Sequence, residues 1–441
     1  DPLWSRGLGD VYKRQILYLI MISLILLVGF VQSWNVALLI LNMCIISSIM
    51  SLGVNIQYGY AGLFNLGIMG FVALGGLATV IISAPPVYEA WDAGGIRIIL
   101  ALSFGALTIF LATYVWKLLK NSRYKSLAIS MILILGFFIY RFIFDPAVEA
   151  IEKINPATEG YLGGLGLPII LSWPVGGLLA AIAAWMIGKI SLGLRSDYLA
   201  IATIGVSEII IFTIKNEDWL ARGVKNVIGL PRPVPYEIDL QQNTNFIYWS
   251  QYLGMDVVDA SSIFVKLCYS LLFMLVLIIL YWLCEKALKS PWGRMMRAIR
   301  DNEVAAEAMG KDVKSRHLQV FILGSAVCGI AGAMLVTLDG QLTPTNYHPL
   351  RFTFIIWVMV ILGGAGNNLG SILGGFIIWF FWVEVEYIGL FLMDILTSGF
   401  ADDNAFRIHM LNSAAYMRYL TLGLILVLVL RFNPRGLIPE K

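Results

Sequence analysis

The sequence predicts an all-α polytopic membrane protein of roughly ten transmembrane helices, with discontinuous or re-entrant glycine-rich segments among them. The first observation is composition: 59% of the 441 residues are hydrophobic and only 13% are charged, whereas soluble proteins carry about 25% charged residues. The second is that apolar runs recur along the whole chain. The third is that no polar stretch is large enough to form an independent soluble core.

Several apolar runs approach the length of about 20 residues that a membrane-spanning helix needs. Three regions, 59–76, 198–214 and 352–375, are short or interrupted by glycine. They predict re-entrant or discontinuous segments, which membranes tolerate only inside protein or beside water. The candidate segments are 16–31, 36–56, 61–83, 96–116, 127–144, 167–188, 198–214, 262–283, 317–338, 352–364, 371–390 and 419–431.

The charges of the connecting segments predict the orientation in the membrane. Basic loops stay on the cytoplasmic side, so the segment 117–125, with four basic and no acidic residues, is placed inside. Alternation along the chain places the basic segment 290–316 on the same side. The segments placed outside, several of them acidic, are 84–95, 145–165, 215–261 and 391–418.

Residues 1–15 are interpreted differently from the rest of the chain. Residues 1–15 are expected to be a non-native assembly artefact, because the chain begins at Asp1 and no pattern continues from these residues into Ile16. A first span at 16–31 is then a shortened one. The remainder, 16–441, is expected to form a single transmembrane domain.

The sequence contains no pattern typical of an enzyme or a metal site. No G-x-x-x-x-G-K-[ST] motif occurs, so the chain has no P-loop to bind and hydrolyse ATP. Its four cysteines form no CxxC pair, and its three histidines are far apart. We therefore expect no catalytic residue, no metal and no cofactor on this chain, and no binding of nucleic acid.

The basic segment 290–316 has the pattern of two short capped helices. Ser290 stands at a favoured N-cap position before Pro291 at the first helical position. A second helix is expected at 303–309, ended by Gly310 at a favoured C-terminal position. Such a loop either docks another molecule or lies on phosphate headgroups as an interfacial helix.

The string Gly293–Gly310 (GRMMRAIRDNEVAAEAMG) resembles the cytoplasmic coupling loop of the permeases of branched-chain amino acid ABC importers. In that family this loop docks on the ATP-binding subunit and passes its motion to the membrane helices. One departure is Val304, where the general importer pattern has Glu. The resemblance implies ATPase coupling by Arg294, Arg297, Arg300, Glu303, Ala305, Ala306, Glu307 and Gly310.

Three further segments extend the resemblance over most of residues 36–375. Asn55–Gly67 and Leu362–Gly375 are similar to the family's early and late glycine-rich segments. Leu194–Glu208 resembles a stretch of the larger of the two paired permeases. One region departs from the family, because Arg222 and Lys225 stand where relatives carry an Asn-x-Thr-Gly-Gly-like turn, and this leaves the cargo open.

The glycines of these segments allow close helix packing, or a broken helix whose backbone groups lie near a pathway. For any one glycine, plain packing is the more common role. Glu208 lies inside an apolar run, where an ionised carboxylate is costly; we favour a structural or gating hydrogen-bond hub over a substrate ligand. The residues assigned to a translocation pathway are Gly59, Gly62, Asn65, Gly67, Tyr198, Glu208, Gly363, Gly364 and Gly366.

The resemblance implies a multi-pass permease subunit of the bacterial inner membrane. Its implied partners are a second homologous permease, two ATP-binding subunits that carry ATP and Mg²⁺, a periplasmic substrate-binding protein, and membrane lipid. The implied cargo is a branched-chain or related amino acid. The alternatives are a urea or short-amide importer of the same family and an ion-coupled secondary transporter.

Overall fold

The computed structural model describes residues 3–119, 124–156 and 159–440, with the backbone alone for 3–11 and 13. Within these ranges the chain is all-α, as the composition predicts. The only strands there are the two-residue β1 (Val227–Ile228) and β2 (Gln341–Leu342), which pair antiparallel.

Ten helical stretches of the described chain are long and apolar enough to cross a membrane, as expected from the sequence. Their main helices are α1 (Leu3–Val31), α2 (Trp34–Val54), α5 (Ile96–Leu118), α6 (Lys125–Glu152), α7 (Ser172–Ser191), α8 (Ser196–Asn216), α12 (Val257–Lys289), α15 (Val313–Asp339), α17 (Asn368–Thr397) and α19 (Met417–Phe432). The stretch that includes α5 begins at Tyr88, and the one that includes α19 begins at Ala405. Two shorter apolar helices are α3 (Ile68–Ser83) and α16 (Ile355–Gly363). The remaining helices are α4 (Tyr88–Ala90), α9 (Asp218–Ala221), α10 (Glu237–Gln242), α11 (Thr244–Tyr252), α13 (Pro291–Asp301), α14 (Glu303–Ala308) and α18 (Ala405–Ser413).

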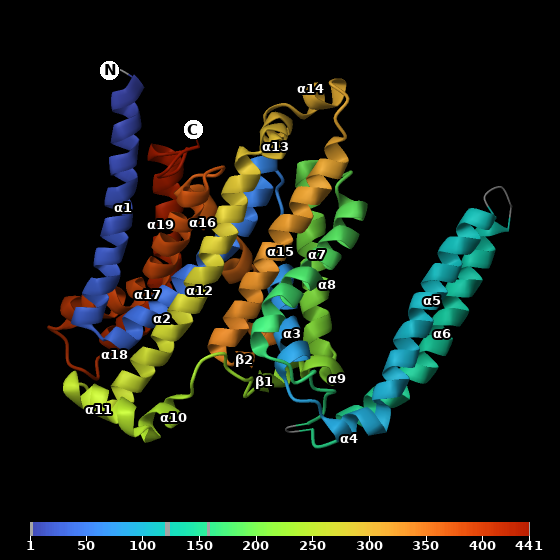
Figure 1. The fold of residues 1–441 in the computed structure, drawn as a ribbon, viewed down its shortest axis with the longest axis horizontal. Coiled ribbons are helices and arrows are strands. Elements are labelled where there is room, and N and C mark those ends of the chain that lie inside the picture. The colour runs from blue at the N-terminus through green and yellow to red at the C-terminus, as the bar shows by residue number, and fades with distance from the viewer. Residues whose placement is uncertain (1–2, 120–123, 157–158, 441) are drawn as a thin grey trace.

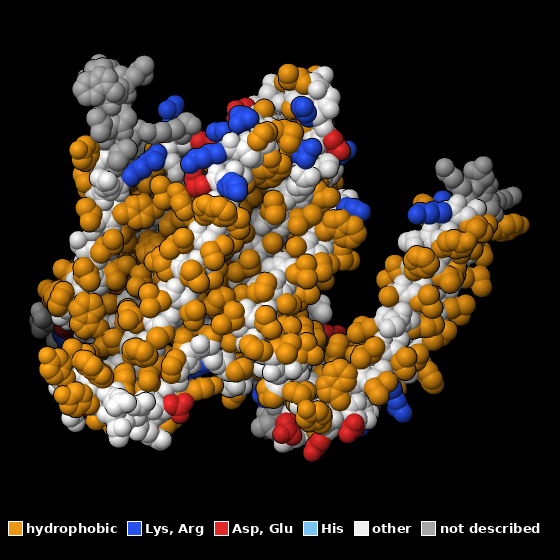
Figure 2. All heavy atoms as spheres, viewed as in Figure 1, with side chains coloured by type: hydrophobic (Ala, Val, Ile, Leu, Met, Phe, Trp, Pro, Cys, Tyr) orange, Lys and Arg blue, Asp and Glu red, His pale blue; other side chains and the backbone are white. Residues whose placement is uncertain are grey.

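The connecting segments gather at two ends of the molecule (Figure 1). The C-terminal end of α5 and the N-terminal end of α6 lie at the same end as α13 and α14, and residues 120–123 between them lie outside the described residues. At the opposite end are α4, α9, α10, α11 and α18. On the face shown in Figure 2, Lys and Arg gather around α13 and α14, and apolar side chains cover the sides. We call the α13–α14 end the inner end, following the charge pattern.

The core of the main bundle is built around α2 and α15. In the most apolar stretches of these helices, 83% and 78% of the residues, respectively, are buried. Helices α3 and α7 pack against α15 through glycines. A Cβ at Gly75 would collide with the carbonyl oxygen of Gly329, and one at Gly332 with that of Val72. Close contact between backbones of this kind is the main way in which helices associate inside a membrane.

Helices α5 and α6 form a hairpin that stands apart from the main bundle (Figure 1). A second apolar cluster, which includes Ile98, Phe144, Leu162 and Trp219, joins this hairpin to the bundle near the outer end. Elsewhere most of the hairpin's apolar side chains are exposed. In a membrane protein such surfaces lie against lipid tails or against another subunit.

Several helices extend into the regions expected to be loops. Helix α6 continues through Pro146 to Glu152, so the connection after it begins at Lys153 rather than at residue 145. Prolines are tolerated in membrane helices because neighbouring groups satisfy the freed backbone. Helix α15 likewise begins at Val313. The segments 84–95, 215–261 and 391–418 contain α4, α9–α11 and α18, together with the ends of the adjoining spans.

Helix α1 runs without interruption from Leu3, through Ile16, to Val31. One expectation about continuity differs from the structure. Helix α8 is continuous, although the sequence predicts a re-entrant or discontinuous segment at 198–214. A Cβ added to its Gly205 would have no heavy atom within 4 Å, so a glycine there does not indicate a break.

The other two glycine-rich regions do interrupt their helices. The chain leaves helical geometry between the π-turn Asn55–Gly59 and α3, and residues 62–67 are non-helical. It turns again at 364–367, between α16 and α17. Both interruptions reverse the chain direction near the inner end of the bundle (Figure 1). We call them the early break (62–67) and the late break (364–367).

Candidate functional site

The inner loop folds as the two capped helices that the sequence predicts. The Ser290 hydroxyl accepts from the Gly293 amide at 3.4 Å, and Pro291 is the first residue of α13. The Asn302 side chain accepts from the Ala305 amide at 3.0 Å and begins α14. Gly310 follows α14 with φ +77°, the left-handed conformation that favours glycine at a helix C-terminus.

Helix α13 is anchored to the bundle by its apolar face. Met296 and Ile299 are almost completely buried, at 0% and 1% exposure. The Trp292 indole N–H donates to Oε1 of Gln319 on α15 at 3.2 Å. Helix α13 is therefore held against the bundle by packing and by a hydrogen bond to α15.

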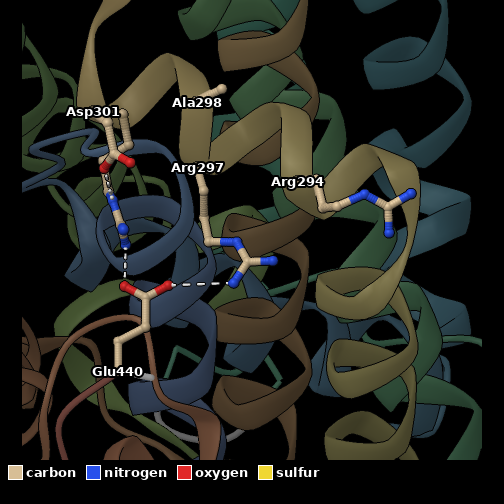
Figure 3. A pocket seen from close by; sticks show the side chains of 6 residues that line it. Arg294, Arg297, Ala298, Asp301 and Glu440 are labelled. Carbon is tan, nitrogen blue, oxygen red and sulfur yellow. Dashed lines mark hydrogen bonds and ion pairs between the residues drawn. The ribbon is translucent and has the colours of Figure 1, made fainter.

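The three arginines of α13 lie in different environments. Arg294 is exposed, and in Figure 3 its side chain extends away from Glu440. Arg297 and Arg300 are partly buried and approach Glu440, which follows α19. A hollow of about 560 Å³ lies among these groups, Ala298 and Asp301.

Arg300 is the residue through which α13 contacts the early glycine-rich segment. Its guanidinium Nη1 donates to the backbone carbonyl of Gly59. The same nitrogen forms an ion pair with Oε2 of Glu440 at 2.7 Å. The predicted coupling helix and the first predicted pathway glycine are therefore in direct contact.

Helix α14 presents a different surface from the one expected. Ala306 is 7% exposed in the isolated chain and belongs to the main buried cluster, so its side chain faces the bundle. Val304 and Met309 are 76% and 77% exposed and form the apolar part of the surface. Sequence reasoning missed both, although an apolar residue in place of the usual Glu at 304 was the available signal. The residues exposed beside them are Glu303, Ala305, Glu307, Ala308 and Gly310.

The early and late glycine-rich segments meet through buried polar side chains. Asn55 Oδ1 accepts from the Gly366 amide at 2.8 Å, and Asn55 Nδ2 donates to Oδ1 of Asn368 at 3.0 Å. The Tyr60 hydroxyl donates to the same Asn368 oxygen. Asn368 Nδ2 in turn donates to Glu285 of α12 at 3.0 Å. The early and late glycine-rich segments, which are far apart in the sequence, are therefore in direct contact.

A second set of hydrogen bonds holds the non-helical residues of the early break. Asn65 is 1% exposed; its Nδ2 donates to Gln57 at 2.8 Å, and its Oδ1 accepts from the Gly67 amide at 2.8 Å. The Trp357 indole N–H donates to the Asn65 carbonyl at 2.9 Å. Non-helical backbone at membrane depth requires such partners.

The remaining predicted pathway glycines allow turns or close backbone contact. Gly62, Gly364 and Gly366 have φ of +68°, +114° and +86°, which other residues rarely adopt. Gly363 packs against the carbonyl of Gly370, where a Cβ would collide with it. Their arrangement fits hinges and packing contacts at the inner end.

Tyr198 and Glu208 lie away from these segments, on the exposed face of α8. Glu208 forms no hydrogen bond or ion pair with any residue that the structure describes, so it is not the hydrogen-bond hub expected within this chain. The opposite face of α8 contacts the early break instead. The Ser207 hydroxyl donates to the Gly67 carbonyl at 2.6 Å, and Thr203 Oγ1 accepts from the Leu66 amide at 3.1 Å.

The region that departs from the family's glycine turn keeps a turn geometry. Arg222 and Asn226 have φ of +57° and +60°, and Gly223 between them has +50°. Strand β1 follows directly and pairs with β2 at the outer end. Arg222 is only 9% exposed.

Most of the chain matches a known protein family. Residues 126–430 match the family model described as the branched-chain amino acid transport system permease component. The chain belongs to this family. The family is one of transport permeases rather than enzymes, and this permease is a multi-pass protein of the inner membrane. No solved structure matches it.

Individual relatives agree with the family assignment. The permease is 26% identical over 281 residues to the high-affinity branched-chain amino acid transport system permease protein LivM of Escherichia coli, an alignment that spans 63% of either chain. It is 25% identical to a probable LivM of Methanocaldococcus jannaschii, over 89% of this chain and 90% of that one. A probable LivH permease of the same archaeon is 31% identical over 90 residues, which are 20% of this chain and 28% of that one. Its alignment to the LivM of Escherichia coli covers 63% of that protein, so the chain spans less than two thirds of this relative's length.

Proposed function

We propose that this chain is the larger permease subunit of an ATP-driven importer that moves branched-chain or related amino acids into the cytoplasm. The observation that carries the proposal is the inner loop, where α13 and α14 form two capped helices and α13 packs on the bundle. Their surface faces away from the bundle through Val304 and Met309, and it contacts the early glycine-rich segment through Arg300.

The proposed partners follow from what the sequence lacks. The chain has no P-loop, so ATP and Mg²⁺ belong to two separate ATP-binding subunits, one of which docks on α13–α14. A second, homologous permease completes the pathway, and a periplasmic binding protein delivers the amino acid to the outer end. The match to both LivM and LivH relatives supports a pair of permeases.

We propose that the pathway runs between the two permeases, beside the early break and the exposed face of α8. An ionised carboxylate facing lipid is costly, so Glu208 and Tyr198 are expected to face a protein partner or water in the assembled complex. A hollow of about 390 Å³ next to Glu208 is lined in part by Thr213, Asn216 and Glu217. The early break supplies the hinge, because it is non-helical and hydrogen-bonded to α8 and α16.

Uptake into proteoliposomes that contain both permeases and both ATP-binding subunits tests this function. With the binding protein on the outer side, radiolabelled leucine is expected to enter only when ATP reaches the ATP-binding subunits, and to enter equally well with an uncoupler present. Uptake that needs no ATP and collapses with the uncoupler would instead support an ion-coupled secondary transporter.

The same assay separates the two cargo classes. The region of Arg222 and Lys225 differs from the family's usual turn, and this difference is the reason to test urea and short amides as alternative cargo. Excess isoleucine is expected to compete with labelled leucine, while excess urea or acetamide is expected to leave uptake unchanged. Strong competition by the amides would reverse the assignment of cargo within the family.

A further inference from the structure

The segment Asn433–Glu440, which follows α19, is built into the inner end of the bundle. It contains a positive-φ glycine, Gly436, whose Cβ position would collide with Gly364 of the late break. Ile438 is only 2% exposed and belongs to the main buried cluster. We call this segment the inner strap.

The inner strap is hydrogen-bonded to the late glycine-rich segment along its backbone. The Leu437 amide donates to the Leu362 carbonyl at 2.8 Å, and the Ile438 amide donates to the Gly363 carbonyl at 3.0 Å. The Asn367 side chain donates to the Pro439 carbonyl at 3.1 Å. Three bonds within a few residues hold the strap against the late glycine-rich segment, which brings Glu440 close to α13.

The carboxylate of Glu440 reaches the coupling helix. Its Oε2 pairs with Arg300 at 2.7 Å, and its Oε1 lies 3.9 Å from Arg297. Figure 3 shows this carboxylate facing α13 with dashed lines to two of its side chains. The Arg300 and Glu440 side chains are 25% and 22% exposed, so water screens this pair less than it screens a fully exposed one.

Arg300 therefore links α13 to two other parts of the inner end, the early glycine-rich segment and the inner strap. On one side its guanidinium holds the Gly59 carbonyl of the early segment. On the other it holds Glu440, and through the strap the late segment. A guanidinium suits this role because its several N–H donors have a fixed planar geometry.

We propose that the inner strap is part of the transmission, and that Glu440 is a positioning residue that couples α13 to the late break through Arg300. This inference rests on the proposed function. When the ATP-binding subunit moves α13, the Arg300–Glu440 ion pair carries the displacement to Gly363 and Gly364, while the Arg300–Gly59 bond carries it to the early segment. Without the carboxylate, α13 moves and the late break does not follow.

The test measures substrate moved per ATP hydrolysed in the reconstituted full complex. Glu440→Lys places a cation against Arg297 and Arg300. This variant is expected to keep ATP hydrolysis within about twofold of wild type and to lower the transport ratio about tenfold, since a charge-assisted hydrogen bond is replaced by repulsion. Glu440→Asp keeps the charge on a shorter side chain and is expected to give an intermediate ratio. Glu440→Ala, the milder deletion, is expected to fall below Glu440→Asp.

A matched control is Glu386→Gln, which removes another ion pair between helices, with Arg418 of α19 and away from α13. Its ratio is expected to equal that of wild type. If Glu440→Lys fails to assemble, the comparison of Glu440→Ala with Glu440→Asp decides. An unchanged ratio in every assembled Glu440 variant overturns the role of the strap and leaves the proposed function intact. A wild-type complex without ATP-driven uptake overturns the proposed function itself.

Discussion

Replacing Val304 and Met309 together with aspartate is expected to abolish the association of this chain with its ATP-binding subunit. Both side chains are more than three-quarters exposed in the isolated chain, Val304 on α14 and Met309 at its C-cap. Apolar groups that fill pockets at the centre of an interface carry most of its binding free energy, about 2 kcal/mol or more each. Two buried charges therefore lower the recovery of co-purified ATP-binding subunit by at least about a hundredfold.

The controls separate docking from folding. Val304→Ile with Met309→Leu keeps the apolar surface and is expected to retain association. Ala306→Asp, at a buried position, is expected to disturb α14 itself and to increase cleavage of the inner loop by protease. Undiminished recovery of the ATP-binding subunit with the two aspartates present would show that α14 is not the docking surface.

Replacing Gly75 with leucine is expected to prevent the bundle from folding. A Cβ at this position already collides with the carbonyl oxygen of Gly329 and lies 2.9 Å from the amide nitrogen of Ala333, both backbone atoms of α15. Backbone cannot rotate away as a side chain can, so α3 and α15 must separate. Overpacking of a core costs about 1–3 kcal/mol and sometimes more, and here it also opens the contact with α7.

The expected result is a reduction of at least about tenfold in detergent-stable monodisperse protein, measured by size-exclusion chromatography of a fluorescent fusion. Gly423→Leu in α19 is the matched control, because no heavy atom lies within 4 Å of its Cβ position. It is expected to behave as wild type. Equal loss in both variants would attribute the effect to leucine in a membrane helix and not to the α3–α15 contact.

Much of this architecture could be predicted from local sequence signals. Runs of apolar residues predict the spans, and loop charge predicts which connections share an end. Ser290, Pro291, Asn302 and Gly310 predict the two inner helices, because caps and left-handed C-termini depend on the residue type at one position. The glycine-rich strings indicated two interrupted helices, and Gly62 and Gly364 supply the positive φ that the turns require.

What could not be predicted depends on contacts between distant segments. Glycine marks a break in the early and late segments, where Gly62 and Gly364 adopt positive φ, but not at Gly205, which stays within the continuous helix α8. The burial of Ala306 and the exposure of Val304 depend on how α14 rests on the bundle. The position of Glu208 on an exposed face follows from which side of α8 meets the early break. The pairing of Glu440 with Arg300 joins residues far apart in the chain, and no local pattern indicates it.

Site-specific photocross-linking from position 304 tests the central claim, that the α13–α14 surface is where ATP hydrolysis on a separate subunit is transmitted to the membrane helices. A photoreactive phenylalanine analogue is placed at 304 in the assembled complex, and in a second sample at 224, an exposed position near the outer end. We expect a cross-link to the ATP-binding subunit from 304 and none from 224. No cross-link from 304 in a complex that hydrolyses ATP would contradict the claim.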